Sequence, residues 1–434
     1  MDTSEVPEAT VQPPFTVNGA HPSPSPDRLT EGRGGRSARL VALDGMRFLA
    51  ALMVLAYHYT YYGRGAWPGG GFPLAASVSR YGWLGVNLFF LISGFVICMS
   101  SWGRGLGEFV VSRVTRLFPA YWFAVLFTTA LLVLLSLPRL TFREILDNLT
   151  MMQQPLGTAA VDGSYWTLWR ELLFYLLFAV VVWRGVNYRR VLSFCVLWML
   201  ASVLASAYPD GFIARFVDVE YSMYFVAGIA MYLMYRFRPT LLLWGLLGWS
   251  WILAEHQLGR VEGALELGGV GRRWWIASAI VTLSFLLVLA AALGWLNWAR
   301  WRVLSFLGAL TYPLYLVHQT VGMSIIWKFG AESNKYVLLP CLVAGMLLLA
   351  WLIHRFIERP VAPVVKRHLR RAIAEAIAHS DAVQSDAVQS DAAAPSGRHA
   401  HPARSLIWPP GHADIPAQRL PTEVSELAQP TQPA

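Results

Sequence analysis

Residues 43–58, LDGMRFLAALMVLAYH, form an apolar run that contains Asp44, Arg47 and His58. In an α-helix Arg47 and His58 share one face, because eleven residues at about 100° each fall within about 20° of three full turns. Their side chains are then about 16 Å apart along the axis. Ionisable groups in a membrane-spanning helix face the bundle interior or a water-filled cavity. The stretch therefore predicts a polar seam inside a helical bundle.

Each of these residues has a simpler interpretation when it is taken alone. Arg47 fits an interfacial anchor that snorkels to the cytoplasm. His58 fits an aromatic belt at the opposite interface, beside the tyrosines of YHYTYY, residues 57–62. The seam is favoured because Arg47 and His58 lie on the same face and Asp44 lies one turn before Arg47.

The composition of the chain indicates a membrane protein. Of its 434 residues 56% are hydrophobic and 14% are charged, whereas soluble domains carry about a quarter charged residues. A helix needs roughly 20 residues to cross the hydrocarbon core, and runs that lack strict alternation favour helices over a β-barrel. Ten apolar segments meet or approach that length: 41–61, 83–101, 118–137, 166–183, 190–208, 219–235, 240–255, 274–295, 304–327 and 336–357. The predicted fold is all-α, a polytopic membrane bundle of about ten transmembrane helices.

This transmembrane domain is predicted to occupy residues 39–360. Residues 1–38 are rich in Pro, Ser, Gly and charge, and they offer no apolar face that could offset the entropy cost of folding. Residues 361–434 are first basic and then of low complexity, with the repeat SDAVQSDAVQSDA at 380–392. Both tails are predicted to be disordered.

Arginines determine the predicted orientation. They cluster before the first apolar segment, between the second and third, between the fourth and fifth, and after the sixth, eighth and tenth. Because cytoplasmic loops carry an excess of Lys and Arg, both termini are predicted to be cytoplasmic, and this requires an even number of spans. Orientation also accounts for the net charge of +9, so no nucleic-acid partner is expected.

Lysine and cysteine usage add two expectations. Only three lysines occur among the 35 basic residues, which together with the richness in Ala, Gly and Pro is typical of a GC-rich bacterial genome. The bacterial inner membrane is the location expected for the chain. Cys98, Cys195 and Cys341 lie inside apolar runs without metal-ligand spacing. We therefore expect neither a metal site nor a disulfide framework.

Two stretches early in the chain carry polar groups suited to binding. GVNLFFLISGFVI, residues 85–97, contains Asn87 and Ser93, and its glycines permit close helix packing or a break. RVTR, residues 113–116, places Arg113 and Arg116 at the cytoplasmic entrance of the third span. Paired guanidinia suit phosphate groups, although positive-inside orientation explains the same pair.

Three later stretches add to this set. WTLWRELLFY, residues 166–175, contains Trp166 and places Glu171 inside an apolar run. Glu171 either pairs with a neighbouring arginine for structure or takes part in catalysis, and the sequence does not separate the two. TYPLYLVHQ, residues 311–319, places His318 in the ninth span, where structural hydrogen bonding is the simpler role. FIERP, residues 356–360, ends the tenth.

In this order, over roughly residues 40–360, the six stretches resemble the membrane acyltransferase-3 family, the integral-membrane O-acyltransferases of bacteria. The resemblance implies transfer of an acyl group from acyl-CoA to a hydroxyl. The family's arginine–ten residues–histidine arrangement falls on Arg47 and His58, its arginine pair on Arg113 and Arg116, and its buried glutamate on Glu171. Two departures bear on acceptor specificity. Asn87 stands where many members have aspartate, and Trp169 with Arg170 replaces small and apolar residues before the glutamate.

The residues suit this chemistry independently. Attack of an alcohol on a thioester needs a general base near neutral pH, and histidine is the side chain poised there. His58 is therefore the predicted base. No serine or cysteine elbow indicates a covalent acyl-enzyme, so direct transfer in a ternary complex is expected. A pantetheine arm is long enough to connect a phosphate clamp with a base about 16 Å away.

The predicted site groups the residues by role. The catalytic residues are His58, Arg47 and Glu171. Arg113, Arg116 and Arg47 are expected to bind acyl-CoA, with acetyl-CoA as the preferred donor. The residues expected to contact substrate are Asp44, Asn87, Ser93, Trp166 and His318.

The acceptor remains open at this level. A macrolide or other secondary metabolite, or its sugar, is one candidate, and a cell-envelope polysaccharide is the other. A transporter or flippase is an alternative of a different class, but the chain shows no internal repeat and few acids at mid-span, both of which are common in secondary transporters. A non-catalytic scaffold would leave the seam from Arg47 to His58 unexplained.

Overall fold

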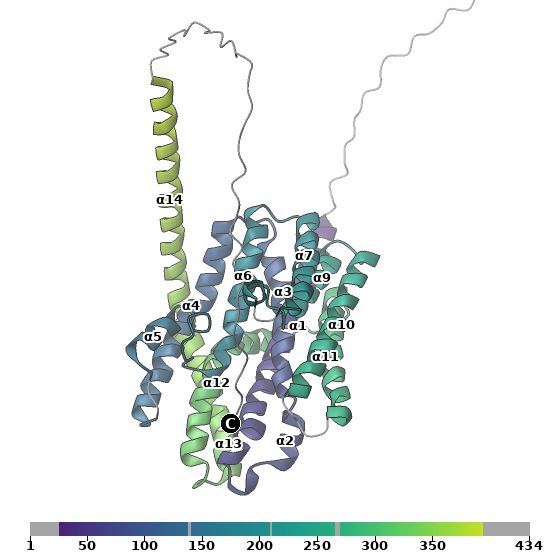
Figure 1. Cartoon of the computed structure of the whole chain (residues 1–434), viewed down its shortest axis with the longest axis vertical. Coiled ribbons are helices and arrows are strands. Elements are labelled where there is room, and N and C mark those ends of the chain that lie inside the picture. Colours follow the sequence, from purple (N-terminus) through teal and green to yellow (C-terminus); the bar gives the residue numbers. More distant parts are fainter. Residues whose placement is uncertain (1–25, 138–139, 209–210, 265–269, 394–434) are drawn as a thin grey trace, which may run out of the picture. The chain divides into compact units, whose positions relative to one another are not determined.

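The computed structural model describes residues 26–137, 140–208, 211–264 and 270–393, and within them all regular structure is helical (Figure 1). The chain divides into two units, residues 1–376 and 377–434, and the described part of the second unit is helical. A helix occurs at each of the ten predicted segments. These helices are α1 (Pro26–Ala56), α3 (Gly85–Ser101), α4 (Leu106–Leu134), α6 (Trp166–Trp183), α7 (Tyr188–Ser206), α9 (Ser222–Arg236), α10 (Leu241–Ala264), α11 (Val270–Leu293), α12 (Arg302–Phe329) and α13 (Lys335–Ile353). The predicted helical membrane bundle is confirmed.

Seven helical segments among the described residues are long and apolar enough to cross a membrane by length and composition. Helices α9, α10 and α12 fall outside that set. Helix α9 has 15 residues, fewer than the roughly 17–25 of a typical span, and its side chains from Ser222 to Met234 are all buried. It is therefore an interior helix, surrounded by the longer ones.

Helices α3 and α9 cross with their backbones in direct contact. A Cβ added to Gly94 of α3 would collide with the carbonyl oxygen of Phe225, and one added to Gly228 of α9 would collide with that of Leu91. Small residues allow such approach between helices in lipid, where packing replaces the hydrophobic effect as the driving force. Of the two alternatives that the glycines of residues 85–97 allowed, close packing is correct, since α3 is unbroken.

Helix α1 lies at the centre of the functional region. It packs against α12 and α3, and α12 in turn packs against α4 and α13 (Figure 1). Two π-helical turns continue the long helices, at Tyr57–Tyr61 after α1 and at His354–Glu358 after α13. Such turns widen the helix locally and occur frequently at functional sites. The regular 100° spacing assumed for residues 43–58 therefore ends at Ala56, two residues before His58.

Helices extend beyond the predicted boundaries at three places. Helix α1 includes residues 26–38 of the predicted N-terminal tail, and Pro26 suits its first turn. Helix α14 (Arg359–Ala393) includes residues 361–393 of the predicted C-terminal tail, and an ion pair between Arg370 and Glu108 (2.9 Å) links it to α4. Helix α4 begins at Leu106 rather than at residue 118, so Arg113 and Arg116 lie inside it. The disorder expected for the two tails stays a prediction. Residues 1–25 and 394–434 are outside the described residues.

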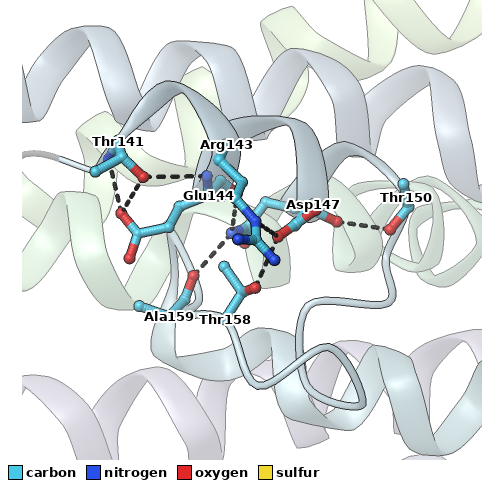
Figure 2. Close-up of polar contacts among 8 residues, drawn as sticks. Thr141, Arg143, Glu144, Asp147, Thr150, Thr158 and Ala159 are labelled. Atoms are coloured by element: carbon cyan, nitrogen blue, oxygen red, sulfur yellow. Dashed lines mark hydrogen bonds and ion pairs between the residues drawn. The ribbon is translucent and has the colours of Figure 1, made fainter.

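Short elements connect the long helices. Between α4 and α6, helix α5 (Phe142–Leu149) begins with a capping box (Figure 2). The Thr141 hydroxyl accepts a hydrogen bond from the Glu144 amide (3.3 Å), and the Glu144 carboxylate accepts one from the Thr141 amide (2.7 Å). The remaining short helices are α2 (Pro73–Ser79) and α8 (Phe212–Val217).

Loss of this cap is expected to loosen α5 without affecting the bundle. In Thr141→Ala the first turn of α5 loses a backbone partner, so amide exchange over residues 142–149 should become roughly fivefold faster. Hydrogen–deuterium exchange with mass spectrometry measures this, and Thr141→Ser, which keeps the hydroxyl, serves as the control. Equal exchange in Thr141→Ala and the parent protein would show that the cap contributes nothing.

Candidate active site

His58 lies in the π-helical turn that follows α1 and is held on one side by two acceptors. Its Nδ1 lies 2.8 Å from the Val54 carbonyl oxygen and 3.2 Å from Nε2 of His318 on α12. The two imidazole rings are 5.0 Å apart between centroids. This contact brings together two residues from the first and the ninth of the predicted spans.

These contacts determine where the protons of the two neutral rings lie. A carbonyl oxygen only accepts, so His318 Nδ1, 2.7 Å from the Tyr315 oxygen, carries a proton and its Nε2 bears a lone pair. For the same reason His58 Nδ1, facing the Val54 oxygen and that lone pair, carries a proton. The Nε2 of neutral His58 is then unprotonated, and it makes no hydrogen bond within the described residues. His58 thus presents a free proton acceptor.

His58 lines a cavity of about 300 Å³, which we call the histidine cavity. Aromatic side chains are the largest group in its wall, and Asn87, Gln319, Arg80 and Ser164 lie among them. Three buried polar atoms of this wall lack a hydrogen-bond partner in the described part of the chain: Arg80 Nε, Trp83 Nε1 and Asn87 Oδ1. The aromatic members are Tyr57, Tyr61, Tyr62, Trp83, Trp166, Tyr221 and Tyr315. Such a wall of flat rings and unpaired polar groups suits a hydroxylated ring with an apolar face.

A second cavity, of about 440 Å³, contains the predicted arginines, and we call it the arginine cavity. Arg47 comes from α1, Arg113 and Arg116 from α4, and Glu171 from α6. Arg113 donates to the Ser112 hydroxyl (2.8 Å), and Arg116 lies 4.0 Å from Glu358. Three guanidinia and one carboxylate leave a cationic surplus, which suits an anionic ligand.

Glu171 is fixed in this cavity by hydroxyl groups. Its Oε1 accepts hydrogen bonds from Ser93 (2.8 Å) and Tyr175 (2.6 Å). No arginine in the described ranges lies within 4.0 Å of the Glu171 carboxylate. Within those residues Glu171 is therefore held by hydrogen bonds from hydroxyl groups and not by a close ion pair.

The two cavities adjoin at a shared wall. Val86 and Tyr315 line both of them. The Tyr315 hydroxyl lies 2.9 Å from that of Thr167, and its ring lies 5.2 Å from the ring of His318. The sequence quoted Tyr315 only as part of TYPLYLVHQ, and no local pattern distinguished it from the other aromatic residues.

The structure separates the predicted substrate residues into three groups. Asn87 and Trp166 line the histidine cavity, and Ser93 lines the arginine cavity. Asp44 and His318 line neither of these cavities. Asp44 lies 4.0 Å from Arg47, and His318, 1% exposed, lies behind His58. Contact with substrate is therefore not the role that their positions support.

Asp162, absent from the sequence-based site, secures the loop before α6 against α12. Its carboxylate accepts hydrogen bonds from Ser164 (2.5 Å from the hydroxyl) and from the Thr320 amide (2.7 Å). Burial raises the pKa of Asp162, and the hydrogen bonds from Ser164 and Thr320 oppose that shift. Asp162 thereby fixes Ser164 in the wall of the histidine cavity. An acid immediately before an apolar segment was the only signal available for it.

The unusual pair before Glu171 points away from both cavities. Arg170 forms ion pairs with Asp218 (2.9 Å) and Glu220 (3.2 Å). Trp169 and Arg170 line neither the histidine nor the arginine cavity but a separate one of about 560 Å³. The departure from the expected motif therefore joins α6 to the segment between α8 and α9.

Comparison with known proteins adds the family context. A profile described as an acyltransferase domain matches residues 40–355. The putative peptidoglycan O-acetyltransferase YrhL of Bacillus subtilis is 24% identical over 364 residues, 74% of this chain and 54% of its own. Acyltransferase MdmB of Streptomyces mycarofaciens is 26% identical over 384 residues, 79% of this chain and 96% of its own. The exopolysaccharide production protein ExoZ of Rhizobium meliloti is 28% identical over 268 residues, 57% of this chain and 78% of its own.

The extent of these matches differs between the relatives. The aligned region spans about half the length of YrhL, at 54%, but nearly the whole of MdmB, at 96%. No solved structure matches the chain.

Proposed function

Because the chain belongs to the acyltransferase-3 family, we propose that it is an integral-membrane O-acyltransferase that moves an acyl group, acetyl as the first choice, from acyl-CoA to a hydroxyl group. The observation that carries this proposal is the free Nε2 of His58. It belongs to a residue that lines an aromatic cavity, next to a cavity with three guanidinia.

In the proposed reaction the acceptor hydroxyl binds in the histidine cavity. His58 Nε2 removes the hydroxyl proton as the oxygen attacks the thioester carbonyl carbon. The new C–O bond forms, the C–S bond breaks, and the leaving thiolate takes the proton from the His58 imidazolium. The products are the ester and free CoA, and no covalent acyl-enzyme is needed.

We assign the arginine cavity to the donor. Arg47, Arg113 and Arg116 would hold phosphate groups and the pantetheine arm, and Glu171 would hold the arm by hydrogen bonding beside them. Arg47 and Glu171 line the donor cavity and not the histidine cavity, so we assign them to donor binding rather than to proton transfer. The thioester would reach His58 past Val86 and Tyr315.

We propose a sugar hydroxyl as the acceptor. The flat aromatic wall of the histidine cavity suits the C–H face of a pyranose, and Asn87 Oδ1 and Trp83 Nε1 can bond its hydroxyl groups. The sugar belongs either to a secondary metabolite such as a macrolide or to a cell-envelope polysaccharide. The names of YrhL and ExoZ favour the envelope.

The proposal also places the protein in the cell. We propose a bacterial inner-membrane location with both termini cytoplasmic, which would open the arginine cavity towards the cytoplasmic pool of acyl-CoA. The histidine cavity would then lie nearer the outer leaflet. Acceptors on the outer face would reach it without crossing the bilayer.

The full-length protein in lipid nanodiscs tests the function. Labelled acetyl-CoA is supplied with a panel of glycosides, and CoA release is measured together with the mass of the glycoside. We expect acceptor-dependent CoA release and a product heavier by one acetyl group. Glycoside movement across proteoliposomes without any thioester consumption would instead identify a transporter.

His318 is expected to act as a positioning residue for His58. In His318→Phe the acceptor for His58 Nδ1–H on α12 is lost, so kcat should fall about tenfold while KM for both substrates is unchanged. His318→Gln, whose amide oxygen can replace Nε2 as acceptor, should recover most of the activity. Equal losses in both variants would indicate only a packing role.

A further inference from the structure

The FIERP stretch, which the proposed reaction does not use, borders a third cavity. It has a volume of about 430 Å³, lies between α4, the π-helical turn His354–Glu358 and the first turns of α14, and we call it the α14 cleft. Its lining includes Arg116, Arg359 and Lys366. Thr115 and Arg116 line both the α14 cleft and the arginine cavity, so the two spaces adjoin at this point.

The charges in the α14 cleft favour an anion. Three permanent cations face one carboxylate, Glu358. That carboxylate is already engaged, 2.6 Å from His354 Nδ1 and 4.0 Å from Arg116. Neither Arg359 nor Lys366 has a carboxylate within 4.0 Å in the part of the chain that the structure describes. Two exposed cations are therefore available to a ligand.

The arrangement of the two spaces restricts the shape of that ligand. Arg359 and Lys366 line the α14 cleft, and Arg116 lines both spaces. The arginine cavity is lined by further arginines and by aromatic residues, and it shares Tyr315 with the histidine cavity. A ligand that fits both spaces carries several phosphates for these cations and a thin arm that can pass the aromatic residues. A nucleotide that bears a phosphorylated ribose, a diphosphate and a pantetheine arm has this shape.

We propose that the α14 cleft is the seat of the nucleotide head of the donor, and that Arg359 and Lys366 bind its ribose 3′-phosphate while Arg116 binds the diphosphate. This inference rests on the proposed function, because it takes acyl-CoA as the donor. It assigns a role to FIERP and to the start of α14, and it extends the donor site beyond Arg47, Arg113 and Arg116. The cations of the α14 cleft bind a phosphate group. Besides the nucleotide, the headgroup of an anionic lipid could supply such a group.

Binding measurements separate these cases without knowledge of the acceptor. The full chain in phosphatidylcholine nanodiscs is titrated with CoA and with 3′-dephospho-CoA. We expect CoA to bind about tenfold more tightly, and we expect Lys366→Ala and Arg359→Ala to remove most of this difference by weakening CoA alone. Arg367→Ala, which removes a neighbouring exposed cation that does not line the cleft, is the matched control and should preserve the difference.

Three other outcomes would overturn the proposal, each in a different way. If the parent protein binds neither nucleotide, acyl-CoA is not the donor and the proposed function fails as well. If it binds CoA and 3′-dephospho-CoA equally, the cleft does not bind the 3′-phosphate, but acyl-CoA can still be the donor. If Lys366→Ala alters nucleotide binding only in nanodiscs that contain phosphatidylglycerol, and equally for both nucleotides, the cleft binds a lipid headgroup.

Discussion

Replacing His58 with alanine is expected to lower kcat for acyl transfer about a thousandfold. The variant loses the only group in the histidine cavity that the structure presents as a free imidazole acceptor among the described residues. Donor binding should be unchanged, because Arg47, Arg113 and Arg116 belong to the other cavity. The measurements are single-turnover acetyl transfer to a glycoside and the Kd of CoA, both in nanodiscs.

A matched control for this prediction is His256→Ala. His256 lies on α10 and lines neither the histidine nor the arginine cavity, so its loss should leave turnover within about twofold. Normal turnover by His58→Ala would refute proton transfer through His58. A parallel loss of CoA binding would mean that the substitution disturbs the bundle rather than the chemistry.

Replacing Gly228 with alanine is expected to destabilise the bundle by about 3 kcal/mol or more, an unusually large effect for one added methyl group. The new Cβ would collide with the Leu91 carbonyl oxygen and approach the Phe95 amide nitrogen. Both are backbone atoms of α3, so the collision cannot be relieved by a side-chain rotation. Thermal unfolding in detergent, followed by loss of monodisperse protein, measures the effect.

The chain offers a close control for the glycine prediction. Gly245, in α10, has no heavy atom within 4 Å of its hypothetical Cβ, so Gly245→Ala should be neutral or slightly stabilising, as alanine is the better helix former. Similar unfolding temperatures for Gly228→Ala and Gly245→Ala would show that α3 and α9 separate easily. The proposed interior position of α9 would then be wrong.

The fold was predictable from the sequence because lipid imposes a strong and local constraint. A segment such as 83–101 must be helical since its backbone has no other partner in hydrocarbon, and α3 occupies it. Boundaries were less predictable where a helix leaves the apolar run. Helix α4 starts at Leu106, twelve residues before the predicted 118, because hydropathy reports the hydrocarbon boundary and not the end of the helix.

The sequence could indicate individual residues of the candidate site, but not the contacts between them. The spacing of Arg47 and His58 indicated the seam, yet the π-helical turn at Tyr57–Tyr61 that reorients His58 leaves no trace in hydropathy. The contact between His58 and His318 spans 260 positions. No periodicity within one segment encodes such a pairing, because it arises from the packing of α1 against α12.

Tyr315 was missed for a related reason. Its significance is that it borders two cavities, and a cavity is a property of several helices together. Asp162 was missed because its partners, Ser164 and Thr320, come from the short 3₁₀ helix Gly163–Tyr165 and from α12. An acid in a short loop is ordinarily solvated, and only the tertiary fold turns it into a buried anchor.

Val86 and Tyr315 are the two side chains common to both cavities. In the proposed orientation they form the partition between the donor side and the acceptor side of the enzyme. A small acyl unit on a slender arm can be handed across this partition, whereas the bulky charged carrier that delivers it stays with the cell. Acceptors outside the membrane could thus be acylated while CoA stays in the cytoplasm. Leakage of ions and water through the same route would be limited by one aliphatic and one phenolic side chain.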